Sequence, residues 1–234
     1  MVSYAWRPKV QWLNHQMNVS DVFMLSWAAK WDGATFVKSA YLTPTEVKNQ
    51  DDKFIVADLA NLIREADIIV AHNGDRFDLP KINGRVALLG LEPLGPVDTI
   101  DTLKLSRQSF GFGYHNLDFL AKEFLGESKI ETNWSWWEDI LNGDPKAMKK
   151  MVRYNKKDVV LLERVFHAMM PYVKNLRRLY EGSGDLSCPY CGSTDRQNRG
   201  KKRNKTTTYQ QHQCNGCLRY YHTNLINKEL AKGN

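Results

Sequence analysis

Apolar residues recur along this chain with two periods, and the change between the periods marks the expected elements. Mixed apolar runs over 22–30 and 34–41 predict two strands, and Asp32-Gly33 between them is a favoured hairpin turn. The continuous apolar run over 67–71 predicts a buried strand, and 97–105 predicts a strand that passes into a helix. Helical spacing of apolar residues predicts four helices, over 50–65, 79–89, 116–125 and 145–170. A hairpin followed by alternating helices and strands indicates an α/β domain with a mixed sheet flanked by helices.

A polar stretch, Glu-Gly-Ser-Gly-Asp at 181–185, predicts a linker and hence two domains, 1–180 and 181–234. The formal charge of +7 is concentrated behind this linker. From Glu181 onward there are nine Lys/Arg against four Asp/Glu, a net charge of +5. Such a basic segment indicates an acidic partner, for which nucleic acid is the natural candidate. The alternative is a lysine-rich loop that only aids solubility.

All four cysteines lie in the last fifth of the chain, as two C-x2-C pairs. This spacing predicts a tetrahedral zinc site, formed by Cys188, Cys191, Cys214 and Cys217. Protein thiolates would fill every position, so the ion would be structural and its binding would supply folding free energy to a segment of ~50 residues. Two disulfides are the alternative, which a reducing compartment disfavours.

Basic residues lie between the two cysteine pairs and precede a Thr/Tyr run, 206–209, that predicts a strand. They are therefore expected in a projecting loop, where they would contact phosphates without reading base sequence. The substrate-binding candidates of this loop are Arg199, Lys201, Lys202 and Arg203. The whole segment resembles a zinc ribbon, a fold that binds DNA, RNA or protein.

Two acidic strings stand far apart in the α/β domain. The first, His-Asn-Gly-Asp-Arg-Phe-Asp-Leu-Pro at 72–80, follows the buried strand and places Asp78 at the start of a helix. The second contains Tyr154 and Asp158, which lie four residues apart and share one face of the long helix. Carboxylates are the ligands that hard divalent cations require, and two-metal phosphodiester hydrolysis needs several of them. Asp78 could instead cap a helix, Asp158 could be a solvated helix residue and Tyr154 an amphipathic anchor.

Together these strings resemble motifs of the RNase H-like, DnaQ-like DEDD 3'–5' exonucleases, in the tyrosine-containing branch. Asn73, Phe77 and Asp78 match the second family motif, and Tyr154 and Asp158 match the third. Segments 98–103 and 116–121 also look like family segments, and the resemblance covers about residues 20–175. With the appended zinc ribbon, the combination is similar to exonuclease-like proteins of bacteriophages.

The resemblance implies a catalytic site with two Mg2+ or Mn2+ ions. Asp158 would bind the ion that activates the attacking water, Tyr154 would orient that water, and Asp78 would support the second ion through water. Asn73 would brace the loop next to the substrate. Asp101 is expected to be structural. The implied partner is nucleic acid, DNA with a single-stranded 3' end, and a replication protein is a further candidate; DNA and RNA are not distinguished by the sequence.

The family pattern also includes a first strand with Asp-x-Glu, and no such motif occurs before Val22. We expect the missing strand to leave a gap in the sheet, either because the chain starts late or because another chain supplies the strand. Three functions follow: a metal-dependent exonuclease, an inactive nuclease-like DNA-binding module, and a zinc-ribbon interaction protein. A cytoplasmic location is expected, in a host cell if the gene is from a phage, and no apolar stretch reaches the ~18 residues of a membrane span.

Overall fold

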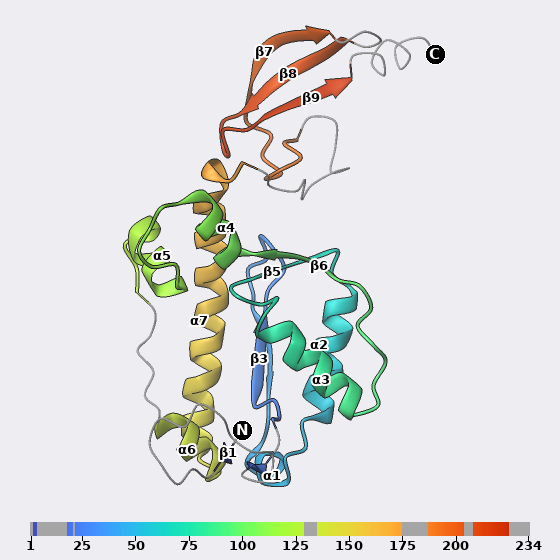
Figure 1. Ribbon diagram of the computed structural model, residues 1–234, viewed down its shortest axis with the longest axis vertical. Helices are drawn as coiled ribbons and strands as arrows, with labels where there is room; N and C mark the ends of the chain where they lie inside the picture. The colour runs from blue at the N-terminus through green and yellow to red at the C-terminus, as the bar shows by residue number, and fades with distance from the viewer. Residues whose placement is uncertain are drawn as a thin grey trace. The chain divides into compact units, whose positions relative to one another are not determined.

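A computed structural model describes residues 2–3, 18–20, 22–128, 135–174, 187–203 and 208–224. The chain forms two compact units (Figure 1). Unit 1 comprises Met1–Lys104 and Gly113–Val165, and unit 2 comprises Leu105–Phe112 and Phe166–Asn234. The expected linker at 181–185 lies outside the described residues, so the predicted boundary after residue 180 stays a prediction.

Unit 1 contains most of the helices that the apolar periodicity predicts. In chain order its elements, two of which continue into unit 2, are β1 (Val2–Ser3), β2 (Asn18–Ser20), β3 (Ser26–Ala29), β4 (Lys38–Tyr41), α1 (Pro44–Asn49), α2 (Lys53–Arg64), β5 (Ile68–Ala71), α3 (Asp78–Leu88), β6 (Asp98–Asp101), α4 (Thr102–Ser109), α5 (Leu117–Leu125), α6 (Ser135–Leu141) and α7 (Pro145–Met169). The four predicted helices correspond to α2, α3, α5 and α7. The short helices α1 and α6 were not predicted.

The strands of unit 1 form two-stranded sheets. β1 pairs with β2 and β3 pairs with β4, both antiparallel, whereas β5 and β6 are parallel, with Ala71 opposite Asp101. In the part of the chain that the structure describes, no strand joins β3 to β5. In these residues the expected mixed α/β architecture is present as separate antiparallel and parallel two-stranded sheets flanked by helices, and not as one continuous sheet.

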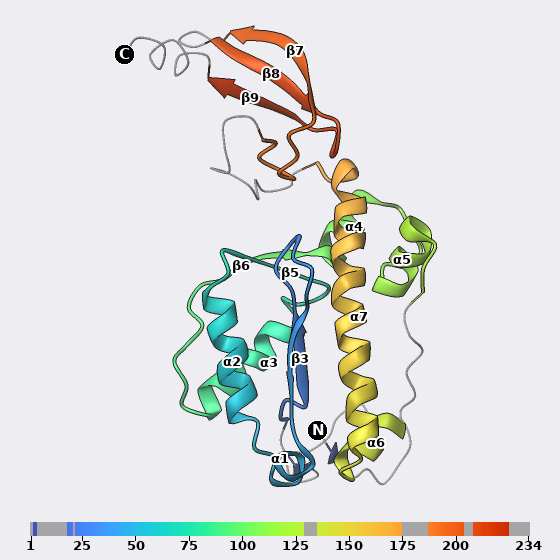
Figure 2. The same ribbon diagram turned by 180° about the vertical axis from the view of Figure 1, so that it is seen from behind.

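One hydrophobic cluster holds unit 1 together. It joins the β3–β4 hairpin to α2, α3, α6 and α7, with Val56 and Ile140 almost completely buried. The Trp27 indole adds a hydrogen bond from Nε1 to the Ile55 carbonyl, at 2.9 Å. In both views β3 runs between α7 on one side and α2 and α3 on the other (Figures 1 and 2). Phe54, which the periodicity assigns to the apolar stripe of α2, is 76% exposed.

A buried ion pair fixes α3 against the start of the domain. Asp52 is fully buried and accepts from the Met24 backbone at 2.7 Å and from Arg85 Nε at 2.9 Å, both at Oδ2. Arg85 Nη2 donates to the other oxygen at 2.5 Å. Because both oxygens of this carboxylate accept hydrogen bonds and its partner is a guanidinium, its charge is compensated inside the protein.

Unit 2 contains the end of α7, a 3-10 turn (Met170–Tyr172) and a three-stranded antiparallel sheet. The sheet has the order β7 (Arg196–Arg203), β8 (Thr208–Cys214) and β9 (Tyr220–Asn224). The expected projecting loop is corrected here, because Arg199, Lys201, Lys202 and Arg203 lie in strand β7. β7 is a strand because it forms backbone hydrogen bonds with β8. Both of its faces are exposed to water, which explains why its sequence shows no alternation of apolar and polar residues. None of the helices within the described ranges is long and apolar enough to cross a membrane.

Candidate functional site

A tight turn after β5 carries the chain into α3 and places Asp78 at the first position of that helix. Asn73 adopts a left-handed backbone, with φ of 64°, and its carbonyl accepts from the Phe77 amide at 3.1 Å. Gly74 is buried, and a Cβ there would lie 2.4 Å from the Ala71 Cβ. Only glycine therefore lets this turn pack directly on β5.

Asp101, at the end of β6, holds this turn in place. Its Oδ1 accepts backbone hydrogen bonds from Asn73 at 2.9 Å and from Leu103 at 3.0 Å, so the carboxylate also caps the start of α4. The side chain is buried, with 5% exposure, and Oδ2 accepts no hydrogen bond within the described residues. Asp101 therefore has the structural role that the sequence suggests, and its second carboxylate oxygen is a buried acceptor without a hydrogen bond among the described residues.

Asp78 and Asp101 interact electrostatically. Asp78 is exposed as a residue, but desolvation of its carboxylate raises its pKa, an effect that nearby Lys81 opposes and the charge of Asp101 reinforces. Two carboxylates thus share the region beyond the carboxyl ends of the parallel strands, where open α/β sheets usually bind ligands. The donor set is all oxygen and one acceptor is unsatisfied, so the pair fits a hard divalent cation.

His72 is fixed beside this pair by a hydrogen-bond relay. The Thr102 hydroxyl donates to the Ala71 carbonyl at 3.1 Å, and its distance to His72 Nδ1 is 2.9 Å. The carbonyl can only accept, so a hydroxyl that donates its one proton there accepts from a protonated Nδ1. His72 therefore takes part in a local hydrogen bond.

Tyr154 and Asp158 lie on the part of α7 that belongs to unit 1. Tyr154 packs against the same hydrophobic cluster that includes Ile82 of α3. The helix is fastened to β3 by a 2.8 Å hydrogen bond from Asn155 Nδ2 to Ser26 Oγ. The structure thus places Asp78 within electrostatic range of Asp101, and it places Tyr154 and Asp158 one helical turn apart on α7. The catalytic and metal-binding roles given to these residues stay predictions.

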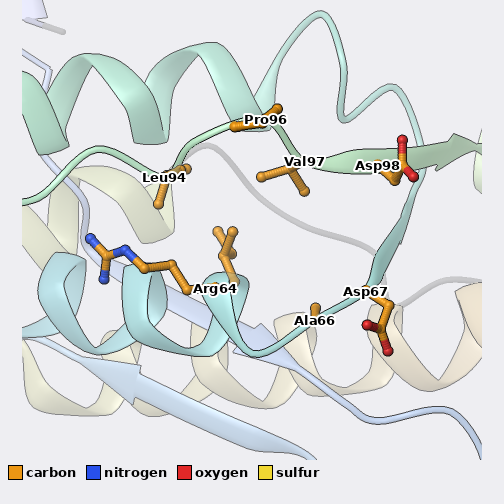
Figure 3. Close-up of a pocket in the computed structure, with 8 residues that line it drawn as sticks. Arg64, Ala66, Asp67, Leu94, Pro96, Val97 and Asp98 are labelled. Carbon is orange, nitrogen blue, oxygen red and sulfur yellow. The ribbon is translucent and has the colours of Figure 1, made fainter.

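A separate cavity of about 310 Å³ opens at the opposite ends of β5 and β6 (Figure 3). Asp67 and Asp98, at the amino ends of the two strands, line it together with Arg64. Arg64 is already bonded to backbone carbonyls, including that of Pro93 at 3.4 Å. None of the residues predicted for the functional site lines this cavity.

The four cysteines of unit 2 converge on one point. The Sγ atoms of Cys188 and Cys217 are 3.6 Å apart, those of Cys191 and Cys214 are 3.5 Å apart, and all four lie within 4.8 Å of one another. Tetrahedral zinc with Zn–S bonds of ~2.3 Å requires sulfur separations of about 3.8 Å. All four thiols are free, so the disulfide alternative is not realised in this structure.

The surroundings of two of these thiols disfavour their charged form. Burial raises the pKa of Cys191 to about 11 and also raises the pKa of Cys217. Burial opposes the thiolate at Cys214 as well, but hydrogen bonds from the Cys217 backbone and the Cys191 thiol lower its pKa overall. Thiolate ligands, tetrahedral spacing and burial together fit a structural zinc ion.

Comparison with known proteins matches residues 15–170 to the family model of the RNase H superfamily. The chain belongs to the RNase H superfamily. This superfamily domain contains both acidic strings, whereas the cysteines lie beyond it.

The RNase H-like domain is also similar to segments of curated DNA polymerases. DNA polymerase 1 of Aeropyrum pernix is 28% identical over 152 residues, which cover 56% of this chain and 15% of the polymerase. A DNA polymerase of Choristoneura fumiferana nuclear polyhedrosis virus is 28% identical over 133 residues, 44% of this chain and 13% of that protein. The PolC-type DNA polymerase III of Ureaplasma parvum is 46% identical over 57 residues, 24% of this chain and 4% of its own length. The chain therefore spans only a small part of these relatives.

Proposed function

We propose that the protein is a metal-dependent 3'–5' exonuclease that acts on DNA. The observation that carries this proposal is the pairing of Asp78 with Asp101 beyond the carboxyl ends of β5 and β6, in a domain of the RNase H superfamily. Similarity to segments of DNA polymerases supports DNA as the substrate class.

Asp78 and Asp158 are the proposed ligands of two Mg2+ or Mn2+ ions, and the unused oxygen of Asp101 is available to the same site. When bound, such ions supply Lewis-acid activation and charge neutralisation for phosphodiester hydrolysis. Tyr154 orients the attacking water through its hydroxyl. Asp78 must be deprotonated to hold a cation, and its pKa is raised, so its cation affinity falls as the pH drops through that raised value.

Asp101 and Asn73 have positioning roles in this proposal. The hydrogen bond from the Asn73 amide to Asp101 Oδ1, at 2.9 Å, joins the turn after β5 to the end of β6. This turn also fixes the start of α3, where Asp78 lies. Preorganised carboxylates of this kind contribute to catalysis because they need no rearrangement when charge develops.

The test is degradation of a 5'-labelled single-stranded DNA oligonucleotide by the purified chain in Mg2+ or Mn2+. We expect stepwise shortening from the 3' end that chelation of the divalent ion stops. Asp158→Ala and Asp78→Ala should each lower the rate at least ~100-fold, the loss typical of removing one electrostatic group from an active site. Asp139→Ala, an exposed aspartate of α6, is the matched control and should keep the wild-type rate. Equal rates for wild type and Asp158→Ala would refute catalysis by this site.

A second candidate is an inactive nuclease-like module that binds DNA, or a zinc-ribbon interaction protein. The net charge of +5 from Glu181 onward and the four-cysteine cluster favour it, because both suit binding to nucleic acid or protein rather than hydrolysis. DNA binding without any degradation in Mg2+ or Mn2+ would select this candidate.

We further propose that the four cysteines bind one structural Zn2+ and that the C-terminal segment is a zinc ribbon. The proposal is supported by the sulfur separations of 3.5 and 3.6 Å across the cluster. Protein purified without chelator should contain one equivalent of zinc that survives dialysis. Metal-free protein with an intact C-terminal sheet would overturn it.

A further inference from the structure

The three-stranded sheet of unit 2 has two chemically different faces. Directly opposed residues of antiparallel strands project to the same face, and neighbours along a strand alternate. Tyr209 lies opposite Lys202 and Asn224, and Gln213 lies opposite Tyr220. Alternation along β8 and β9 then adds Gln211 and His222 to the same side. We define the aromatic face as the side that carries Tyr209, Tyr220, His222, Gln211, Gln213 and Lys202.

The opposite face is used for internal packing. His212, Tyr221 and Cys214 project there and are buried, with 5%, 3% and 0% exposure. His212 is also bonded on both ring nitrogens, to Asn198 and Thr223, each at 2.9 Å. The zinc cluster and the small core of this unit therefore depend on that face and not on the aromatic face.

The rings of the aromatic face are accessible. Tyr220 is 52% exposed, His222 is exposed, and Tyr209 is half-buried. The Tyr209 and His222 ring centroids are 5.9 Å apart, so two of the three rings form one contiguous group. Exposed aromatic rings contribute nothing to folding by burial, which leaves their surface for a ligand.

Arg199 of β7 adds a second cation to this face. Pairing of β7 with β8 is irregular between Asn198 and Lys201, where Gly200 has a φ of +82°. Arg199 follows Asn198, which faces the buried side, so Arg199 projects onto the aromatic face and donates to Gln213 Oε1 from Nε at 3.0 Å and from Nη2 at 2.6 Å. Arg199 and Lys202 therefore flank the rings, and none of the residues of β7, β8 and β9 is acidic.

We propose that the aromatic face binds single-stranded nucleic acid. Bases stack on Tyr220, Tyr209 and His222, and the phosphates lie against Arg199 and Lys202. The argument is charge complementarity: the +5 charge from Glu181 onward and the acid-free strands suit a polyanion, and rings between cations suit unstacked bases. The choice of nucleic acid over another anion rests on the proposed nuclease function.

The binding mode predicts a specific dependence on bases. Each base stacked on an aromatic side chain is worth ~1–3 kcal/mol by alanine substitution, which is roughly 5- to 150-fold in the dissociation constant. Stacking tolerates any base because every base has a π face. Each phosphate contact that is removed should lower the slope of log K against log salt by about 0.7 for a single strand.

The experiment measures fluorescence anisotropy with two probes of equal charge and length, labelled oligo(dT) of 12 nucleotides and an abasic 12-mer. The protein is the full chain, loaded with zinc and carrying Asp158→Ala, in buffer without Mg2+ or Mn2+. We expect oligo(dT) to bind at least ~10-fold more tightly than the abasic strand. Tyr220→Ala should remove most of that difference, whereas Tyr220→Phe should keep it. Arg199→Gln should weaken both probes and flatten their salt dependence.

Tyr114→Ala is the matched control, because Tyr114 is 68% exposed but lies in unit 1. Zinc content and far-ultraviolet circular dichroism of each variant verify that the sheet is intact. Equal affinity for the two probes, or an unchanged preference in both Tyr220→Ala and a Tyr209→Ala/His222→Ala variant, would overturn the proposal. A protein that binds in this way but never degrades DNA would refute the proposed nuclease and leave this inference standing, so the two can fail separately.

Discussion

Two aspartates in the same region of the RNase H-like domain have different chemistry because of their surroundings. Asp101 uses one oxygen to accept backbone amides, including that of Asn73 at 2.9 Å. Asp78 has a raised pKa because its carboxylate is desolvated and feels the charge of Asp101. The first residue holds the local backbone in place, and the second has a carboxylate whose charged form is disfavoured.

Gly74, in the turn before α3, allows a stability test in which a single Cβ atom is added. Gly74→Ala would place a Cβ 2.4 Å from the Ala71 Cβ, so the turn must shift. We expect a loss of about 1–3 kcal/mol in the free energy of unfolding, measured by urea denaturation, as for other overpacked sites. Gly84→Ala is the control, because a Cβ there meets no atom within 4 Å and lies inside α3. It should stabilise the protein by ~0.5–1 kcal/mol, and equal effects of the two changes would contradict the argument.

The position of Asp78 at the start of a helix that follows a buried strand could be predicted from the sequence, because an apolar run is followed by a helical pattern. Its role in a metal site stays a prediction. The pairing with Asp101 could not be predicted, since Asp101 in the sequence is only one of several aspartates near a strand end. The parallel register, Ala71 opposite Asp101, is what brings the two carboxylates together. That register depends on long-range packing.

At the scale of elements, α3 is held by a charged contact as well as by the hydrophobic cluster. Arg85 of α3 bonds both oxygens of Asp52, and the same carboxylate binds the Met24 amide before β3. Three chain segments therefore meet at one buried group. Its loss should loosen the helix that carries Asp78.

We expect Asp52→Ala to cost about 3–5 kcal/mol in the free energy of unfolding, because Arg85 would lose its counter-ion while its side chain is only 14% exposed. Chemical denaturation monitored by tryptophan fluorescence measures this. Asp118→Ala is the comparison, since Asp118 forms an exposed i,i+4 pair with Lys122. Its expected cost is below ~1 kcal/mol. Similar losses in both variants would mean that burial adds nothing to the Asp52 contact.

Long amphipathic elements could be predicted, and short or solvated ones could not. Helix α7 was evident from its Asp144-Pro145 start and its apolar period. Strand β7 carries no apolar alternation, because all but its first residue are exposed. Helix α1 was missed although its capping box, Thr43 with Glu46 around Pro44, is visible in the sequence. Six residues are too few for a hydrophobic period to stand out.

At the scale of the whole molecule, the two units draw their stability from different sources. Unit 1 has one hydrophobic cluster built from two sheets and several helices. The sheet of unit 2 buries few large side chains besides Tyr221 and its cysteines. A cation bound by the four thiols would therefore supply much of the folding free energy of unit 2.

Removal of the metal should unfold the C-terminal sheet and leave the RNase H-like domain folded. With a chelator, trypsin should cleave rapidly after Arg199 and Lys202, and it should spare the hydrophobic cluster of unit 1. Cys191→Ser should reproduce this pattern without a chelator. The free energy involved is of order 10 kcal/mol, typical of structural zinc. Continued resistance of β7 to trypsin in a chelator would show that the sheet is stable without metal.

The superfamily was predictable from the sequence because its motifs are local strings, whereas the arrangement of the sheets was not. The match over residues 15–170 confirms the RNase H-like assignment. The separation of β3–β4 from β5–β6 depends on which strands meet in space. Each C-x2-C pair is brought together by a short local turn, and the spacing pattern was sufficient to predict that the two pairs would meet.

The two faces of the β7–β8–β9 sheet keep the charge of a zinc–thiolate centre away from the proposed DNA surface. Four thiolates around one Zn2+ form a centre with a formal charge of two minus, which repels phosphate. Cys214 projects from the face opposite Tyr220, so the sheet itself stands between this dianion and the proposed DNA surface. Arg199 and Lys202 then offset the residual field on the DNA side. The sheet thus separates the metal centre from the polyanion as well as carrying the residues that contact it.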